Sequence, residues 1–370
     1  MRSNKDKKII FFSRDLNIGG MEKALVALLN ILAEKYSTTL VLENKSGPLL
    51  SQLNDKITVK EYRLSSCRFT LLRKILNFSH RLCWTILNYN KYIFSCNYAT
   101  YSVIGSKLAC VASKNSALYV HSNYLGYFQG DKLKTCSFFE NVNIDKFKNV
   151  IFVSNECKEA AEEIFPDKSN NFFVINNIIN SEEIEKKSNA AVEQAFDGDK
   201  TNILFVGRLD DTSKNFVLLL ESFRLAYQKN ENLRLYIIGN GPDEAKIKEY
   251  IKNHSICGIT LLGEKQNPYP YIKMCDCMIL TSKYEGYPVV YTEALILNKQ
   301  FITTVPVSDD YINVRDFFTI TDFKPQNIAS AILKVNKNKI NYNLDFNFAN
   351  QDRIRKIERI IFKRGNNNEN

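Results

Sequence analysis

The stretch Ser282-Lys283-Tyr284-Glu285-Gly286-Tyr287-Pro288-Val289-Val290-Tyr291-Thr292-Glu293-Ala294-Leu295 carries the strongest fold signal in this 370-residue chain. A short apolar run that ends at Leu280 precedes it, and Pro288 suits the first turn of a helix, where a backbone N–H is not needed. The stretch therefore predicts a strand, a loop and a helix, with Glu285 on the loop and Glu293 about two turns into the helix. Because helical side chains lean toward the N-terminus, both carboxylates can reach a ligand at the helix end.

A helix N-terminus attracts anions, whereas two carboxylates beside it repel a bare phosphate. A ligand that carries hydroxyl groups as well as phosphate, such as a sugar nucleotide, satisfies both conditions. The residues of this stretch thus favour that class of ligand.

The length fits two domains of about 150–200 residues each. Nine cysteines without paired spacing and only three histidines disfavour a zinc site and indicate reduced thiols in a cytoplasmic protein. The apolar run at residues 9–12 is too short for a secretory signal, and no stretch reaches the roughly 18–20 apolar residues of a membrane span. We expect no metal and no cofactor.

Strand and helix patterns alternate in two halves of the chain. The first half predicts strands at 8–13, 38–42, 117–120, 150–153 and 172–175, and helices at 21–33 and from residue 154. The second half predicts strands at 202–206, 233–238, 259–262, 277–280 and 301–304, with helices between them. Such alternation is typical of parallel, doubly wound sheets, so we expect an α/β protein with two Rossmann-like domains, 1–180 and 181–350, facing a cleft. Residues 351–370 predict a C-terminal helix with a disordered end.

Positive charge is concentrated in the first half. Residues 1–180 hold 24 Lys and Arg against 15 Asp and Glu, and no acid occurs from 62 to 130. Within that segment, apolar residues from Leu72 to Leu87 repeat at helical spacing, with Arg73, Lys74 and Arg81 off the stripe. The helix is either a core helix with a solvated basic face or an amphipathic helix on an anionic membrane. The absence of acids favours an anionic surface or substrate.

The loop from Gly207 to Asn215 follows a predicted strand and holds two cations, Arg208 and Lys214. A guanidinium fork and a lysine point charge suit a diphosphate, and they would offset the charge that develops as a phosphate departs. The alternative is a loop whose cations pair with Asp210 and Asp211.

Three further sites contain weaker signals. Gly239-Asn240-Gly241 follows a strand without the third glycine of a dinucleotide site, which disfavours nicotinamide binding. Gly19 and Gly20 precede a helix and would let a ligand approach the backbone. His121 ends a predicted strand, where it is either a structural histidine or a hydrogen-bonding partner of a substrate hydroxyl.

These loops, in this order, resemble the retaining nucleotide-sugar glycosyltransferases of the GT-B fold (family 4, glycosyl transferases group 1), which include sucrose synthase. The resemblance is strongest from residue 202 to residue 307, in the Gly-Arg-Leu…Lys-Asn loop, the Gly239 turn, Leu262-Gly263 and Glu285-x7-Glu293. In the first half it includes Gly19-Gly20-x-Glu22 and His121.

The resemblance implies the following roles. Arg208 and Lys214 would hold the donor diphosphate, Glu285 would contact the transferred sugar, and His121 would contact that sugar or its developing charge. Glu293 would accept hydrogen bonds from the ribose hydroxyls, and the loop after Gly263 would lie near the base. The donor site would further include Gly19, Gly20, Gly239, Gly286, Tyr287, Pro288 and Val289.

We therefore predict a retaining, metal-independent hexosyltransferase of the cytoplasmic face of the membrane. It would move a hexose or N-acetylhexosamine from a nucleotide diphosphate sugar, UDP-linked by preference, to a glycan or polyprenyl-diphosphate-linked acceptor in capsule or O-antigen synthesis. The sequence gives no indication of nucleic-acid binding. The alternatives are a sugar-nucleotide epimerase of the same fold and a non-catalytic protein that binds anionic glycans or membranes.

Overall fold

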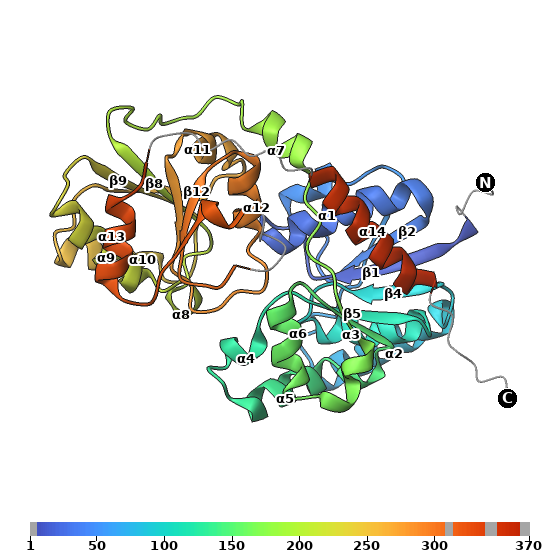
Figure 1. Ribbon diagram of the computed structural model, residues 1–370. Helices are drawn as coiled ribbons and strands as arrows, with labels where there is room; N and C mark the ends of the chain where they lie inside the picture. Colours follow the sequence, from blue (N-terminus) through green and yellow to red (C-terminus); the bar gives the residue numbers. More distant parts are fainter. Residues whose placement is uncertain (1–5, 308–313, 337–345, 363–370) are drawn as a thin grey trace. The chain divides into compact units, whose positions relative to one another are not determined.

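The computed structural model describes residues 6–307, 314–336 and 346–362. The chain divides into two compact units, one made of residues 1–179 and 348–370 and the other of residues 180–347 (Figure 1). Each unit is an α/β domain built on its own sheet. The predicted α/β class and GT-B-like repetition of two such domains are confirmed. The predicted disordered end, from residue 365, lies outside the described residues.

Unit 1 is built on a seven-stranded, wholly parallel sheet in the order β3-β2-β1-β4-β5-β6-β7. The interior strand β1 contains a run of isoleucine and phenylalanine residues buried on both faces, as expected for a parallel sheet covered by helices. The strands of this sheet are β1 (Lys8–Ser13), β2 (Ser37–Leu42), β3 (Thr58–Glu61), β4 (Phe94–Asn97), β5 (Ser116–Val120), β6 (Asn149–Phe152) and β7 (Phe172–Val174).

The helices of unit 1 connect these strands and cover the sheet. Several have a side-chain N-cap; Ser154, for example, accepts a hydrogen bond from the backbone of Cys157. The helices are α1 (Gly20–Lys35), α2 (Thr70–Asn88), α3 (Val103–Ala112), α4 (Tyr124–Tyr127), α5 (Lys132–Asn141), α6 (Asn155–Glu162) and α14 (Phe346–Phe362), with short 3-10 turns at Pro48–Gln52, Ile144–Lys146 and Pro166–Asn171.

Helix α14, the predicted C-terminal helix, packs on unit 1 although it follows unit 2 in the sequence (Figure 1). Arg353 donates to the backbone oxygen of Asn177 at 2.8 Å, and the Tyr36 hydroxyl donates to Glu358 at 2.9 Å. The apolar side of the helix, including Ile357, is buried. The chain therefore closes unit 1 with a segment that is distant in sequence.

Helix α2 is present where the apolar stripe predicts it, but the core-helix alternative is wrong. None of its residues is buried. No helix among the described residues has both the length and the apolar content needed to cross a bilayer.

Unit 2 is built on a six-stranded parallel sheet in the order β10-β9-β8-β11-β12-β13. The carboxyl ends of β8, β9, β10 and β11 lie at one edge, which collects the loops singled out in the sequence. The strands are β8 (Thr201–Val206), β9 (Leu233–Ile238), β10 (Ile259–Gly263), β11 (Cys277–Leu280), β12 (Gln300–Thr303) and β13 (Phe318–Ile320). The helices are α7 (Ser181–Lys187), α8 (Asp211–Lys214), α9 (Phe216–Tyr227), α10 (Glu244–Asn253), α11 (Tyr269–Met274), α12 (Val289–Ile296) and α13 (Pro325–Leu333).

Candidate functional site

The loop after β8 folds into the short helix α8, which ends at Lys214. Asp210 caps this helix by accepting from the backbone of Thr212, and Asn215 ends it in a left-handed conformation. The two predicted phosphate ligands differ in environment. Arg208 is exposed and has no ion pair with any described residue, whereas Lys214 is largely buried.

The structure joins Lys214 to Glu285, 71 positions away in the sequence, in an ion pair of 2.5 Å. The Ser282 hydroxyl donates to the same carboxylate oxygen, also at 2.5 Å. Backbone contacts lock the two loops together: Lys283 N donates to Ser213 O at 2.9 Å, and the Thr281 hydroxyl donates to Lys214 O at 2.9 Å. The alternative in which Lys214 pairs with Asp210 or Asp211 is therefore wrong.

The backbone N–H groups at the start of α12 form the second part of this edge. The helix begins at Val289, and Pro288 is its N-cap residue rather than its first helical residue. Pro288 makes no side-chain cap hydrogen bond to this end, and the backbone N–H of Tyr291 donates to the backbone oxygen of Pro288 at 3.0 Å. Tyr287, between Gly286 and Pro288, is buried and anchors the turn. An uncapped helix N-terminus beside Lys214 and Glu285 suits an anionic ligand.

Glu293 lies deeper in α12 and is buried. The Tyr269 hydroxyl of α11 hydrogen-bonds to it, and burial, with the nearby Glu293 carboxylate, raises the pKa of Tyr269. Tyr269 therefore donates to Glu293 at neutral pH. The contact of Glu293 with a ribose remains a prediction. A ligand that made this contact would have to share the Glu293 carboxylate with Tyr269.

The Gly239 turn has a packing function. Its φ is +146°, and a Cβ at this position would lie 1.9 Å from the backbone oxygen of Gly207. A Cβ at Gly241 would similarly lie 2.3 Å from the backbone oxygen of Leu209. These glycines let the loop after β9 pack directly on the loop after β8. Gly263 has a φ of +69° and open space around it, and its backbone oxygen accepts from Gly239 N at 2.9 Å.

His121 belongs to unit 1, at the end of β5. Its ring stacks on Tyr119 at 4.6 Å and contacts Tyr98 at 4.4 Å. Burial lowers the pKa of His121 to about 3, so the ring is neutral at physiological pH. Both ring nitrogens are buried, and no hydrogen bond of acceptable geometry is made to either. A neutral His121 supplies no positive charge, and its contact with a sugar remains a prediction.

Gly19 and Gly20 open helix α1, also in unit 1. Glu22 folds back over this end: a Cβ on Gly19 would lie 2.1 Å from a Glu22 carboxylate oxygen. Burial, with nearby Asp15, raises the pKa of Glu22 to about 7. An ionised Glu22 disfavours phosphate at this helix end, and the proposed contact of Gly19 and Gly20 with phosphate remains a prediction.

The structure thus brings Lys214, Glu285 and the α12 N-terminus together in unit 2, with Arg208 on the same loop as Lys214. Sequence reasoning missed Ser282 and Tyr269 as partners of the two glutamates. The signal for Ser282 was its place three residues before Glu285; Tyr269 left no sequence signal. Within the described residues, no group of three or more His, Cys, Asp or Glu side chains is placed to hold a metal ion.

Comparison with known proteins finds relatives of the chain by sequence and by structure. Residues 186–353 match the family described as Glycosyl transferases group 1. A 164-residue segment is 29% identical to an uncharacterised glycosyltransferase, MJ1059, of Methanocaldococcus jannaschii, and the match spans 43% of this chain and 40% of that protein. A longer match, 25% identical over 86% of this chain and 85% of its relative, is to the N-acetylgalactosamine-N,N'-diacetylbacillosaminyl-diphospho-undecaprenol 4-alpha-N-acetylgalactosaminyltransferase of Campylobacter jejuni.

Solved structures share the fold at low sequence identity. HepE of Anabaena, solved with UDP and glucose, superposes with a TM-score of 0.66 at 13% identity, covering 95% of this chain and 99% of HepE. A TarM variant of S. aureus, solved with UDP, Fondaparinux and alpha-GlcNAc-glycerol, gives a TM-score of 0.66 at 14% identity, covering 96% and 97% of the two chains. Both are GT-B glycosyltransferases, and the chain has the GT-B fold.

Proposed function

This chain has a GT-B fold and carries a Glycosyl transferases group 1 domain, and we propose that it is a retaining transferase that moves a hexose or N-acetylhexosamine from a UDP-sugar to a polyprenyl-diphosphate-linked glycan. The observation that carries the proposal is the ion pair between Lys214 and Glu285 beside the uncapped N-terminus of α12. One cation, one carboxylate and a helix N-terminus without a side-chain cap, all at a single sheet edge, match the phosphate and the hydroxyl groups of such a donor.

The chemistry follows from the positions of these groups. The donor diphosphate would take Lys214 and the α12 N-terminus as partners, and Arg208, exposed on the same loop, would fold onto it. These positive groups offset the charge that develops on the departing phosphate. Glu285, released from part of its pairing with Lys214, would accept hydrogen bonds from hydroxyls of the transferred sugar. The departing phosphate would help to deprotonate the acceptor, so that no further base and no metal ion are required.

The donor and the acceptor in this proposal are inferred from the relatives of the chain. HepE and TarM were solved with UDP, and the Campylobacter relative is named for transfer to a diphospho-undecaprenol-linked sugar. Relatives of this kind act in bacterial glycan synthesis, which favours a surface polysaccharide such as capsule or O-antigen as the pathway product.

The deciding experiment incubates the purified chain with UDP-glucose, UDP-N-acetylglucosamine or UDP-N-acetylgalactosamine and with a polyprenyl-diphosphate-linked sugar. We expect UDP to be released only when the acceptor is present, and the release to persist in EDTA. The product formed from an α-linked donor should itself be α-linked. Lys214→Met should abolish it, whereas Lys229→Gln, an exposed lysine elsewhere in unit 2, should not. Conversion of the donor sugar without acceptor would assign the chain to the epimerases instead. Absence of UDP binding by calorimetry would exclude both enzymes.

A further inference from the structure

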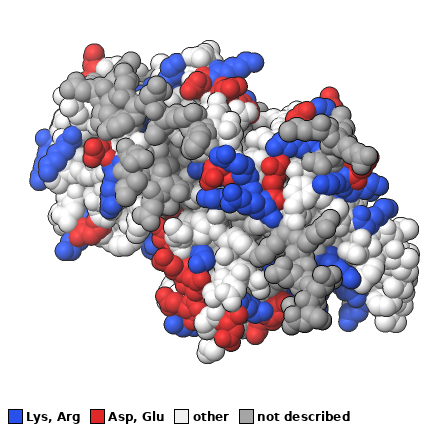
Figure 2. Space-filling view, turned by 45° about the vertical axis from the view of Figure 1, so that its right-hand side comes forward, with Lys and Arg blue, Asp and Glu red and all other residues white. Residues whose placement is uncertain are grey.

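Glu293 of α12 differs from the other acids of this chain in its depth. Figure 2 shows acidic side chains in red on the surface, several of them beside lysines and arginines. Of the acidic residues that the structure describes, Glu293 is the least exposed, at 2%. A carboxylate at such a depth needs hydrogen-bond donors in place of the water that it has lost. The identity of those donors therefore bears on what else Glu293 can bind.

Tyr269, the first residue of α11, supplies one such donor. Its hydroxyl hydrogen-bonds to Glu293, and the residue is itself only 7% exposed. The carboxylate of Glu183, on α7, acts on the same hydroxyl. Burial, together with these two carboxylates, raises the pKa of Tyr269. The hydroxyl therefore keeps its proton at neutral pH and acts as a donor.

Local contacts fix the backbone around Tyr269. Pro268, the N-cap residue of α11, precedes it and has a restricted φ. The backbone N–H of Tyr269 donates to the side-chain oxygen of Asn267 at 3.3 Å. The side-chain nitrogen of Asn267 in turn donates to the backbone oxygen of Lys187, the last residue of α7, at 2.9 Å. Helices α7, α11 and α12 also contact one another. These contacts hold the Tyr269 hydroxyl in a defined place beside α12.

The Glu293 carboxylate can serve the protein and a ligand together. A carboxylate has about four acceptor positions, so Glu293 can accept from Tyr269 and from a ligand hydroxyl at the same time. Tyr269 is a fixed part of the fold, whereas a ligand hydroxyl is present only in the complex. Because hydrogen bonds depend steeply on distance and angle, the orientation that Tyr269 imposes on the carboxylate governs how well the ligand hydroxyl binds.

We propose that Tyr269 is a positioning residue of the donor site. Its hydroxyl fixes the Glu293 carboxylate in the orientation that accepts a hydrogen bond from a ribose hydroxyl, so that the two residues select ribonucleotides over their deoxy analogues. This inference rests on the proposed function, because it takes the ribose of a uridine nucleotide as the ligand of Glu293. Tyr269 acts through Glu293 and does not itself contact the nucleotide.

The test measures the binding of UDP, 2′-deoxy-UDP and 3′-deoxy-UDP to the full chain by calorimetry. The selectivity is the Kd of the more weakly bound deoxy analogue divided by the Kd of UDP. One hydrogen bond to a charged group predicts a selectivity of about tenfold or more for the wild-type chain. Tyr269→Phe should lower the selectivity to about threefold or less by weakening UDP alone, with the Kd of that analogue unchanged. Glu293→Gln should lower it to a similar extent.

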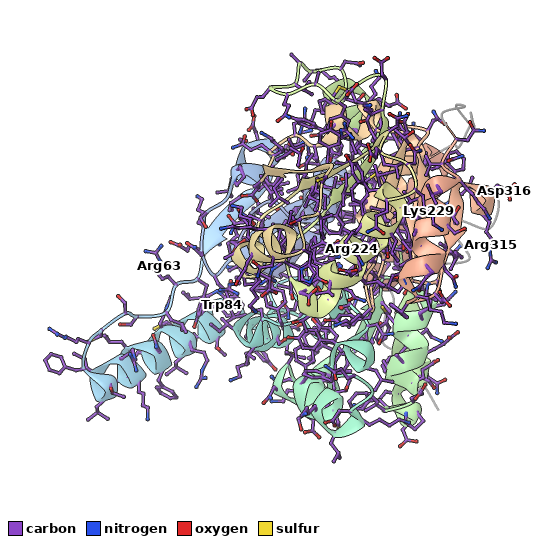
Figure 3. All side chains as sticks on the ribbon, turned by 90° about the vertical axis from the view of Figure 1, so that its left-hand side faces the viewer. Arg63, Trp84, Arg224, Lys229, Arg315 and Asp316 are labelled. Carbon is purple, nitrogen blue, oxygen red and sulfur yellow. The ribbon has the colours of Figure 1, made fainter. Side chains whose placement is uncertain are left out.

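The matched control is a second tyrosine–glutamate pair of unit 2. The Tyr250 hydroxyl of α10 donates to Glu221 of α9 at 2.7 Å, and Arg224, labelled in Figure 3, donates to the same carboxylate. Tyr250→Phe removes an equivalent hydrogen bond and should leave the selectivity unchanged. A purely structural role of Tyr269 would weaken all three nucleotides alike, and thermal unfolding of both variants would reveal it.

A second variant covers the case in which Tyr269→Phe does not fold. Asn267→Ala keeps the Tyr269 hydroxyl but removes the contacts that fix the start of α11. It should lower the selectivity by about twofold or more, since a misaligned hydrogen bond is weaker. An unchanged selectivity in Asn267→Ala would then count against the inference.

The outcomes separate this inference from the proposed function. A wild-type chain that binds no uridine nucleotide would overturn the proposed function, and the inference with it. UDP binding without any selectivity, or a selectivity that Tyr269→Phe retains, would overturn the inference alone. Equal losses of selectivity in Tyr250→Phe and Tyr269→Phe would also overturn it, because the effect would then come from stability.

Discussion

Replacing Glu285 by glutamine should separate donor binding from sugar transfer. In the structure the Glu285 carboxylate pairs with Lys214 at 2.5 Å, with both side chains less than one-fifth exposed. A donor phosphate must compete with this carboxylate for the lysine. Glu285→Gln keeps the size and the hydrogen bond from Ser282 but removes the competing charge.

The expected magnitude follows from charge-assisted hydrogen bonds, which contribute about 1.5–3 kcal/mol each. If phosphate has to displace only part of that interaction, losing the carboxylate strengthens UDP binding by about 1 kcal/mol, or about fivefold in Kd. Lys214→Met should instead weaken UDP binding by about tenfold or more, since its phosphate partner is lost. Transfer should fall by about a hundredfold in Glu285→Gln, because the neutral amide is a poorer acceptor for the sugar hydroxyls in the transition state.

The assay pairs calorimetric titration of UDP with measurement of UDP release during transfer. Glu249→Gln, an exposed acid on α10, is the matched control and should change neither quantity. Weaker UDP binding in Glu285→Gln would refute the argument, because it would show that the carboxylate supports phosphate binding rather than opposing it. Unchanged transfer would remove Glu285 from the reaction.

Other positions yield further expectations. Gly239→Ala should lower the free energy of unfolding, measured by urea denaturation, by about 3 kcal/mol or more, because the new Cβ would meet the backbone oxygen of Gly207. Gly263→Ala should lower it by only about 1 kcal/mol, because the space around Gly263 is open. The pKa of Glu22 rises from 4.5 to about 7 in the fold, so stability should decrease as pH rises from 4.5 to 7, by up to about 3 kcal/mol, and Glu22→Gln should remove that slope. The pKa of His121 falls to about 3, so His121 should contribute stability that is lost as pH falls below 6.5. His121→Asn should lower the transfer rate without shifting its pH profile between pH 6 and 8; a shifted profile would contradict a neutral ring.

Long apolar runs and turn residues allowed most of the fold to be predicted. The strands at 8–13, 233–238 and 277–280 have the predicted bounds, because each is a continuous buried run between polar turns. The sequence did not reveal β3 and β4, since Thr58–Glu61 is a polar edge strand and Phe94–Asn97 is short. Helix α3 was missed because its apolar residues surround the helix without clear periodicity.

The sequence likewise predicted part of the candidate site and left the rest open. Glycines, cations and carboxylates on loops after strands predicted a donor site at one edge of unit 2, because parallel strands bring their carboxyl ends to one edge. Local sequence could not pair Lys214 with Glu285, 71 positions away, or place Tyr269 on Glu293. Such contacts depend on how strands are ordered in the sheet, which a single sequence leaves open.

The sequence by itself determined the two α/β halves, the loops that carry the candidate site of unit 2 and the amphipathic character of α2. Only the tertiary structure decided which way α2 faces. Periodicity fixes an apolar stripe on a helix, but it does not say whether that stripe meets the core or the solvent. The packing of Trp84 on Phe12 and Tyr62 decides this by holding the polar side of the helix against the domain. The same kind of long-range packing brought two charges that are distant in sequence, Lys214 and Glu285, together in one candidate site.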